Sequence, residues 1–496
     1  MWYQHCADQL GHNPMDADPL ASFTAAQTAY TRGDLETAAI CFEEALSAYQ
    51  ARGELVNVAA CYNNLGILAY TQGDLAHAEV LYWQSLNLYR QEKQRQEEPS
   101  VLGNLGATLQ SLGRLDEATE CYQQALASAR DQKDRNAEAS ALGNLGAARF
   151  EAGDLNGAEL VLQEALLLAR EVGNRRVEVN ALGNLGVLHK DRSNYDVARS
   201  YLEAAFALAQ AEGLVLAQFS HLTNLGNLCR HLGDYEGALG WQQQALDLAQ
   251  RNRYRQGEVI AEGNLGLAAF ARADYYTAML HFQQAHRLAR SIGYRQGEVA
   301  QLENMANCHL MLGRTDEAEP LLRQALVIEQ DTNNRYGQML ALADLSYVKL
   351  LQGQPQEAMA LLNQAWPTAR EVSGPEQLAR LFWSKGDLHL TMGEVEAAYT
   401  AYVAAVSQME AIRGQLSRES DRATFITAER ARIFGKLVLL LKQAFTQPAE
   451  ALSYAERARS RLLLDQLAGS VQNEVVTQVR GDPLEYVAIR EILASR

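Results

Sequence analysis

The chain lacks long apolar stretches. Among its 496 residues, no purely aliphatic run is longer than the one at Leu437–Leu441. A membrane-spanning helix needs about 20 apolar residues, so this run is far too short to cross a bilayer. The first residues, Met1-Trp2-Tyr3-Gln4-His5, lack the basic start and apolar core of a secretory signal peptide. We therefore expect no membrane association and a cytoplasmic location.

Basic charge and cysteine are also scarce. Lys and Arg number 44 against 60 Asp and Glu, a formal net charge of −16, which argues against nucleic-acid binding. None of the six cysteines forms a C-x-x-C pair, so we expect core thiols in a reducing compartment and no disulfide framework or zinc site. His281 and His286 are five residues apart and share a helix face poorly. With no phosphate loop or dinucleotide fingerprint, the sequence predicts no metal, cofactor or catalytic residue.

What the chain does have is a strict period of 40 residues. A turn position, most often glycine, recurs five residues before each member of an alanine column. Such a period indicates one supersecondary unit copied ten times and stacked in a line. The turn residues are Gly33, Gly73, Gly113, Gly153, Ser193, Gly233, Ala273, Gly313, Gly353 and Gly393. The alanines are Ala38, Ala78, Ala118, Ala158, Ala198, Ala238, Ala278, Ala318, Ala358 and Ala398.

Each unit is predicted to be an antiparallel helix pair. In Val58–Tyr70 the apolar residues have helical spacing. Gly73 then supplies a left-handed C-terminal conformation and Asp74 a cap for the next helix, from about Leu75 to Arg90. Ala78 and Gly66 are expected where the two helices cross, because a larger side chain there would push the backbones apart.

The segments Asn64-Leu65-Gly66, Gly73-Asp74-Leu75 and Ala78-Glu79, with a second small-residue column from Ala45 to Ala405, resemble the tetratricopeptide repeat. The resemblance covers about Pro19 to Ile412, with 40 residues per unit instead of the commoner 34. It implies an all-α, right-handed superhelical solenoid of about ten helix-turn-helix repeats with a C-terminal helical cap. We expect an N-terminal lead at 1–18 and the solenoid at 19–412.

A second column of charged residues follows the loops between repeats. Arg95, Arg135, Arg175, Arg255, Arg295 and Arg335 are each followed three residues later by Glu or, at 338, by Gln. We interpret them as ion pairs that lock successive repeats. A basic ligand-binding strip is the alternative, which the paired glutamates weaken.

The candidate binding residues form an asparagine ladder in the first helices, continued by Asp344. Asparagine is a poor helix former, so its repeated mid-helix placement needs a reason. In tetratricopeptide proteins this position faces the concave groove, where an amide can bond to a peptide backbone. Preceding glycines at 103, 143, 183 and 263 would let that backbone approach closely. Bonds to neighbouring repeats are the alternative. The ladder is Asn64, Asn104, Asn144, Asn184, Asn224, Asn264 and Asn304.

By the same family geometry, a further set of positions faces the groove, and the residue type at these positions varies between repeats. Such variation is expected of a surface that recognises one specific partner. Of these, Lys190 and Arg230 would favour an acidic segment. The set is Tyr70, Gln110, Phe150, Lys190, Arg230, Phe270 and Leu310.

After Ile412 the 40-residue period is lost. The sequence predicts a helical junction at 413–468 and a tail at 469–496. The segment Ala451–Ala468 resembles the helix that precedes the peptidase domain in bacterial TPR–CHAT proteins, which are caspase-like. The last cysteine is Cys308 and the last histidine is His389, both in the repeats. We therefore expect the catalytic domain to lie beyond this chain.

The sequence thus predicts a scaffold that binds a protein or peptide in its concave groove, as the sensor arm of a CHAT-type protease. The alternative is a free-standing adaptor without an attached enzyme. An intramolecular contact with a downstream domain is a further expectation.

Overall fold

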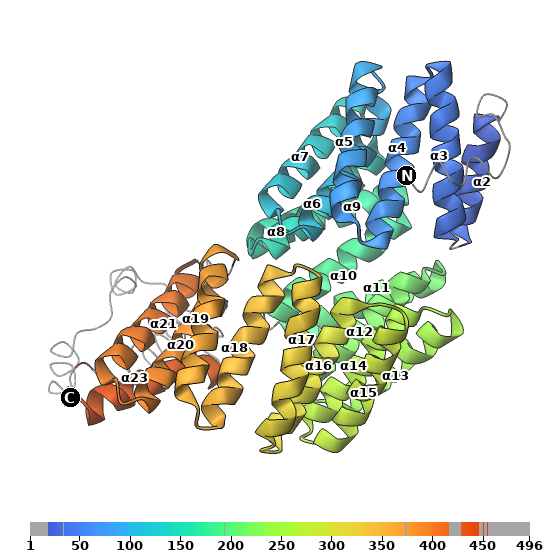
Figure 1. Ribbon diagram of the computed structural model, residues 1–496. Coiled ribbons are helices and arrows are strands. Elements are labelled where there is room, and N and C mark those ends of the chain that lie inside the picture. Colours follow the sequence, from blue (N-terminus) through green and yellow to red (C-terminus); the bar gives the residue numbers. More distant parts are fainter. Residues whose placement is uncertain are drawn as a thin grey trace, which may run out of the picture. The chain divides into compact units, whose positions relative to one another are not determined.

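The described part of the chain is built of helices alone. The computed structural model describes residues 18–32, 34–192, 194–372, 374–415 and 428–445, with residues 450 and 454. These residues contain 21 α-helices, the 3-10 turn η1 (Arg95–Glu97) and no strand (Figure 1). The helices are α2 (Pro19–Thr31), α3 (Leu35–Arg52), α4 (Leu55–Gln72), α5 (Leu75–Gln91), α6 (Glu98–Ser111), α7 (Leu115–Gln132), α8 (Arg135–Glu151), α9 (Leu155–Val172), α10 (Arg175–Asp191), α11 (Tyr195–Ala211), α12 (Val215–His231), α13 (Tyr235–Arg251), α14 (Arg255–Ala271), α15 (Tyr275–Ser291), α16 (Arg295–Met311), α17 (Thr315–Asp331), α18 (Arg335–Leu351), α19 (Pro355–Val372), α20 (Pro375–Thr391), α21 (Val395–Gln415) and α23 (Ala428–Gln443).

The helices follow one another as ten pairs, from α2 and α3 to α20 and α21, which confirms the predicted all-α repeat architecture. From α3 to α21 the second helix of every pair begins 40 residues after the one before. The described residues up to His189, with Asp196–His221, form one compact unit. Lys190–Tyr195 and the described residues from Leu222 onward form another.

The turn within each pair has the predicted left-handed backbone. Gly73, for example, has φ +83°, and the other described glycines of the column lie between +73° and +82°. Ala273 takes the same conformation, φ +60°, although it carries a side chain. Gly33 and Ser193 lie outside the described residues. The Asp74 carboxylate caps the next helix by accepting from the His77 backbone N–H, at 3.1 Å.

The two helices of a pair cross where the small residues lie. All ten alanines of the first column are at most 1% exposed. In the second column Ser85 replaces alanine and donates its hydroxyl to the Ala59 carbonyl oxygen, at 2.8 Å. Gly66 lies against the Tyr82 ring, which is buried. The close crossing therefore depends on residues with one side-chain carbon or none.

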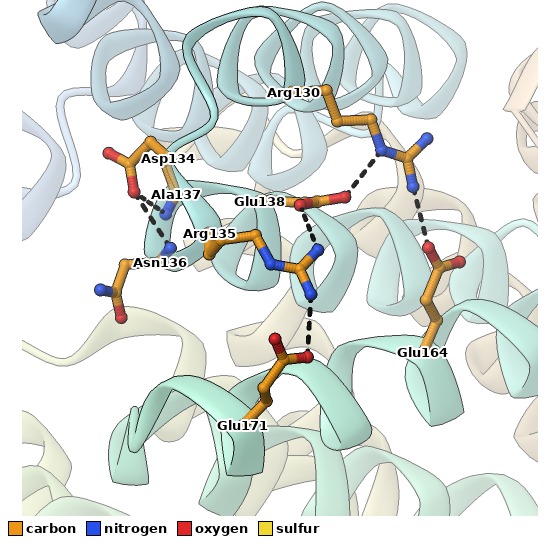
Figure 2. Close-up of polar contacts among 8 residues, drawn as sticks. All are labelled: Arg130, Asp134, Arg135, Asn136, Ala137, Glu138, Glu164 and Glu171. Atoms are coloured by element: carbon orange, nitrogen blue, oxygen red, sulfur yellow. Dashed lines mark hydrogen bonds and ion pairs between the residues drawn. The ribbon is translucent and has the colours of Figure 1, made fainter.

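Most of the charged residues between repeats form ion pairs, as we interpreted them. Arg135, Arg175, Arg255 and Arg295 each pair with the Glu three residues on, and Arg335 pairs with Glu371, whereas no such pair occurs between Arg95 and Glu98. Figure 2 shows Glu138 of α8, which accepts from Arg130 Nε at 2.8 Å and from Arg135 at 3.1 Å. The same two arginines reach the following helix, where Arg130 donates to Glu164 and Arg135 to Glu171, both at 2.8 Å. Both arginines are about half exposed, so solvent screens each pair, and the network mainly fixes the register of neighbouring repeats.

The structure also gives the burial of the cysteines and the character of the helices. Cys61, Cys121, Cys229 and Cys308 are buried and Cys41 is half-buried, and none of these five forms a disulfide, whereas Cys6 lies outside the described residues. None of the helices in the described part has the length and apolar character needed to cross a membrane. No group of three or more His, Cys, Asp or Glu side chains that could hold a metal occurs among the described residues.

The C-terminal part is described only in places. Helix α21 continues to Gln415, beyond the expected end of the solenoid at 412, and α23 packs beside it. Residues 416–427, 446–449, 451–453 and 455–468 of the predicted junction lie outside the described residues. Tyr454 is buried among the side chains of this C-terminal cluster, and the Tyr399 hydroxyl donates to Glu450 at 2.8 Å.

Candidate functional site

The first helices of successive pairs carry the asparagine ladder. In each unit, we call the solvent-facing side of these helices, the even-numbered ones from α4 to α20, the first-helix face. In each repeat the asparagine precedes a buried Leu or Met and the small residue of the crossing, but its own side chain is not fully buried. Six of the seven asparagines are half-buried, and Asn144 is exposed. The ladder positions are thus accessible at the surface of both units.

Four ladder amides already have an acceptor within the protein. Asn104 donates to Asn63 Oδ1 of the preceding repeat at 3.1 Å, and Asn264 donates to Gln242 at 3.3 Å. Asn64 donates to the Ala60 backbone oxygen of its own helix, at 2.8 Å. Asn304 makes a longer contact of 3.4 Å with Gln301. Each of these carboxamides keeps a second N–H, so an internal bond does not exhaust its capacity.

The other three ladder residues differ. Among the described residues, Asn144, Asn184 and Asn224 have no side-chain hydrogen bond, so their complete amide groups are available to a ligand. A buried amide without a partner would be costly, but these three side chains are at least partly in contact with solvent. They are therefore the strongest members of the predicted binding set.

The four glycines that precede ladder residues differ in the free space around their Cα atoms. A Cβ added to Gly183 would collide with the His221 ring, and one added to Gly263 would lie 3.0 Å from Gln301 Nε2. At Gly103 the nearest side-chain atom is 3.6 Å away and at Gly143 it is 3.8 Å away. Side chains of the next repeat thus fill the space above two of the four glycines, and sequence spacing alone could not reveal which.

The two basic candidates lie in the second unit. Lys190 Nζ is 3.1 Å from Asp191, and its side chain is 23% exposed, so part of its charge is already compensated. Arg230 is half-buried, its Nε has no hydrogen-bond partner among the described residues, and burial lowers the pKa of its guanidinium. Lys190 and Arg230 both lower the pKa of His231, after the larger effect of burial, which indicates that the three groups are close together.

A cavity of about 480 Å³ lies on the first-helix face of the second unit, and sequence reasoning did not find it. It is formed mainly by α16, α18 and α20, and Leu322 of α17 and Lys436 of α23 also line it. Leu310, Leu350 and Leu381 provide apolar walls, while Asp344 continues the ladder into it. The volume lies in the range of pockets that hold small ligands or single side chains.

Some polar groups of this cavity have hydrogen-bond partners within the protein, and others do not. Lys436 Nζ donates to both carboxylate oxygens of Asp387 at 2.6 Å, and the Tyr402 hydroxyl donates to the same carboxylate at 2.5 Å. Lys436 also lies 5.3 Å from the centre of the Trp383 ring. In contrast, the buried Trp383 Nε1 has no acceptor among the described residues, and burial raises the pKa of Asp344 to about 6. Asp344 and the Trp383 N–H are therefore groups that a ligand could satisfy.

Comparison with known proteins gives one family and several distant structures. A model described as tetratricopeptide repeat matches residues 20–91, 97–171, 138–211, 218–291 and 298–371, well over half of the chain. No curated protein matches the sequence. The chain resembles a Rap protein solved in complex with competence and sporulation factor, with 16% identity and a TM-score of 0.45 over 71% of this chain and 99% of the other.

Two further solved structures are similar. BtubC from P. vanneervenii is 20% identical, with a TM-score of 0.39 over 44% of this chain and 92% of the other. A signal transduction ATPase with numerous domains and a tetratricopeptide repeat sensor, from Pyrococcus horikoshii, is 14% identical, with a TM-score of 0.46. That alignment covers 67% of this chain and 53% of the other.

Proposed function

The chain belongs to the tetratricopeptide repeat family, and on that premise we propose that it is a scaffold that binds a protein or peptide segment along its first-helix face. The observation that carries this proposal is the cavity between α16, α18 and α20, which combines apolar walls with unsatisfied polar groups. A rigid stack of helices with a hollow of this kind offers an anchor site for one side chain of an extended segment.

The rest of the first-helix face supports the same function. The amides of Asn144, Asn184 and Asn224 offer donors and acceptors for a peptide backbone. The side chains of the variable column differ from repeat to repeat, and Tyr70 among them is 39% exposed. We propose that Lys190 and Arg230 receive an acidic part of the bound segment, because the Arg230 guanidinium lacks an anionic partner among the described residues.

We further propose that the scaffold acts in the cytoplasm as the regulatory arm of a CHAT-type cysteine protease. The support is the resemblance of Ala451–Ala468 to the helix that precedes such protease domains, a segment that lies outside the described residues except for Tyr454. Sequencing the gene beyond Arg496 tests this part alone. A continuation that encodes a His followed by a Cys in a separate domain is expected, whereas any other continuation, or none, favours the free-standing adaptor.

Peptide binding itself is tested by selection from a random dodecapeptide library displayed on phage, with the full chain immobilised. The variant Asn307→Trp should block the cavity from its rim, because Asn307 is exposed and lines the cavity. Asn363→Trp is the matched control, since Asn363 is exposed on the second helix α19 and does not line the cavity.

Selected peptides, labelled with fluorescein, should bind the full chain in anisotropy titrations. We expect Asn307→Trp to weaken binding at least about tenfold, a loss of roughly 1.4 kcal/mol, and Asn363→Trp to leave it unchanged. Failure to enrich any peptide, or equal binding by the two variants, would refute a binding site in this cavity.

A further inference from the structure

We propose that the cavity between α16, α18 and α20 takes a basic side chain, lysine or arginine, of the bound segment and pairs its cation with Asp344. This inference rests on the proposed peptide-binding function and names the chemistry of its anchor. It differs from the acidic segment proposed for Lys190 and Arg230, which lie on other first helices.

The shape of the cavity suits a long side chain with a charged end. Leu310 and Leu350 line it and would cover the methylene stem of a lysine or arginine. Tyr347, 49% exposed, and Trp383 contribute aromatic rings to the same lining. A carboxylate beside aromatic rings is an arrangement that attracts cations, because the negative face of each ring adds to the attraction of the carboxylate.

Two carboxyls in this region have no partner among the described residues. Asp344 lines the cavity and forms no hydrogen bond or ion pair there, and neither does Glu303 of α16, which does not line the cavity but lies near Asp344. Burial, and after it the charges of Asp344 and Glu329, raise the pKa of Glu303 to about 7, so these carboxyls lie close together. Burial similarly raises the pKa of Asp344. A cation placed here would relieve both effects.

The cations already present do not fill this role. Lys436 is held by Asp387, whose two oxygens it contacts at 2.6 Å. Arg380 lines the cavity from α20 and lowers the pKa of Asp344, but it is exposed and forms no ion pair with it. An acidic ligand attracted by Arg380 would add a carboxylate beside Asp344 and Glu303, which is unfavourable.

The test uses the dodecapeptide selection with the full chain and with Asp344→Asn. This substitution installs the residue that occupies the same position in seven other repeats, so the fold should tolerate it, and its melting temperature should equal or exceed that of the parent chain. Asp331→Asn is the matched control, because Asp331 is exposed at the end of α17 and does not line the cavity.

We expect most enriched peptides to carry Lys or Arg at one common position next to apolar residues. Asp344→Asn should weaken such a peptide about tenfold, as loss of a charge-assisted hydrogen bond does, whereas Asp331→Asn should change its affinity less than about twofold. Replacing the basic residue of the peptide by Gln should give a similar loss, with little further loss in the Asp344→Asn variant.

Enriched peptides that lack a basic residue, or that bind Asp344→Asn as tightly as the parent chain, would overturn the inference. If Asn307→Trp still blocked those peptides, the proposed binding face would stand and only the nature of the anchor would be wrong. If Asn307→Trp had no effect, both proposals would fail.

Discussion

Gly66 and Tyr82 are in direct contact where α4 crosses α5. A Cβ added to Gly66 would lie 2.7 Å from the Cε1 atom of the Tyr82 ring, closer than side-chain carbons approach other atoms. The ring is 2% exposed and cannot move aside without opening the core. The same relationship recurs along the chain, with Gly106 against Tyr122 and Gly386 against Tyr402.

Gly66→Ala should therefore destabilise the chain although alanine is the better helix former. The clash should cost about 1–3 kcal/mol, against a gain in helix propensity of about 1 kcal/mol. Gly240→Ala is the matched control, because a Cβ there would meet nothing within 4 Å inside α13, and it should stabilise by about 0.5–1 kcal/mol. Urea unfolding followed by circular dichroism measures both, and a stabilising Gly66→Ala would contradict the close crossing.

A larger side chain in the alanine column should destabilise mainly the helices next to it. Ala198 is fully buried, and its carbonyl oxygen would lie 3.3 Å from a Cβ added to Gly186, so Ala198→Leu should cost about 1–3 kcal/mol. In a repeat stack each unit contacts its neighbours, so hydrogen exchange should speed up mainly near α10 and α11. Ala204→Leu on the exposed side of α11 should change little. Faster exchange along the whole chain would argue against local coupling.

The unpaired ladder residues should matter for binding and not for folding. Replacing Asn184 and Asn224 together by Ala should weaken a selected peptide that contacts either residue while leaving the melting temperature the same or slightly higher, since alanine favours helix by about 0.6 kcal/mol per site. Asn104→Ala, which removes the bond to Asn63, should instead lower stability. A large drop in melting temperature for the double variant, with binding unchanged, would assign the ladder a structural role.

Stability should depend on pH through Glu319. The hydrogen bond from the buried Lys349, 2.9 Å long, is the main cause that lowers the pKa of Glu319 to about 2. Because the folded state binds the proton less well than the unfolded state, this contribution is fully present above about pH 4.5 and is lost as the pH falls toward 2. Glu319→Gln should thus destabilise the protein by about 1–3 kcal/mol at pH 7 and by less at pH 3. An equal loss at both pH values would contradict this assignment.

The sequence predicted those features that repeat. The 40-residue register of Ala78 and its counterparts placed the helix pairs, the turns at Gly73 and its equivalents, and the small crossing residues, because each copy has to pack against the next in the same way. The paired arginines and glutamates between repeats were predictable for the same reason, and Glu138 illustrates them.

The cavity could not be predicted because it depends on departures from the repeat. Asp344 replaces asparagine, Trp383 occurs once at its position, and Lys436 comes from α23, outside the register. Only the folded chain brings these residues from α18, α20 and α23 together. Periodicity likewise could not show that the His221 ring fills the space above Gly183, since that depends on the direction of one side chain.

The central claim is that a peptide binds the first-helix face, and photo-cross-linking tests it most directly. A selected peptide carrying benzoylphenylalanine beside its basic residue would be irradiated on the full chain, and the cross-linked residues identified by mass spectrometry. The account predicts cross-links within α16, α18 and α20, around Asn307 and Tyr347, which are lost in Asn307→Trp. Cross-links confined to second helices that do not line the cavity, such as α15 and α19, would contradict it.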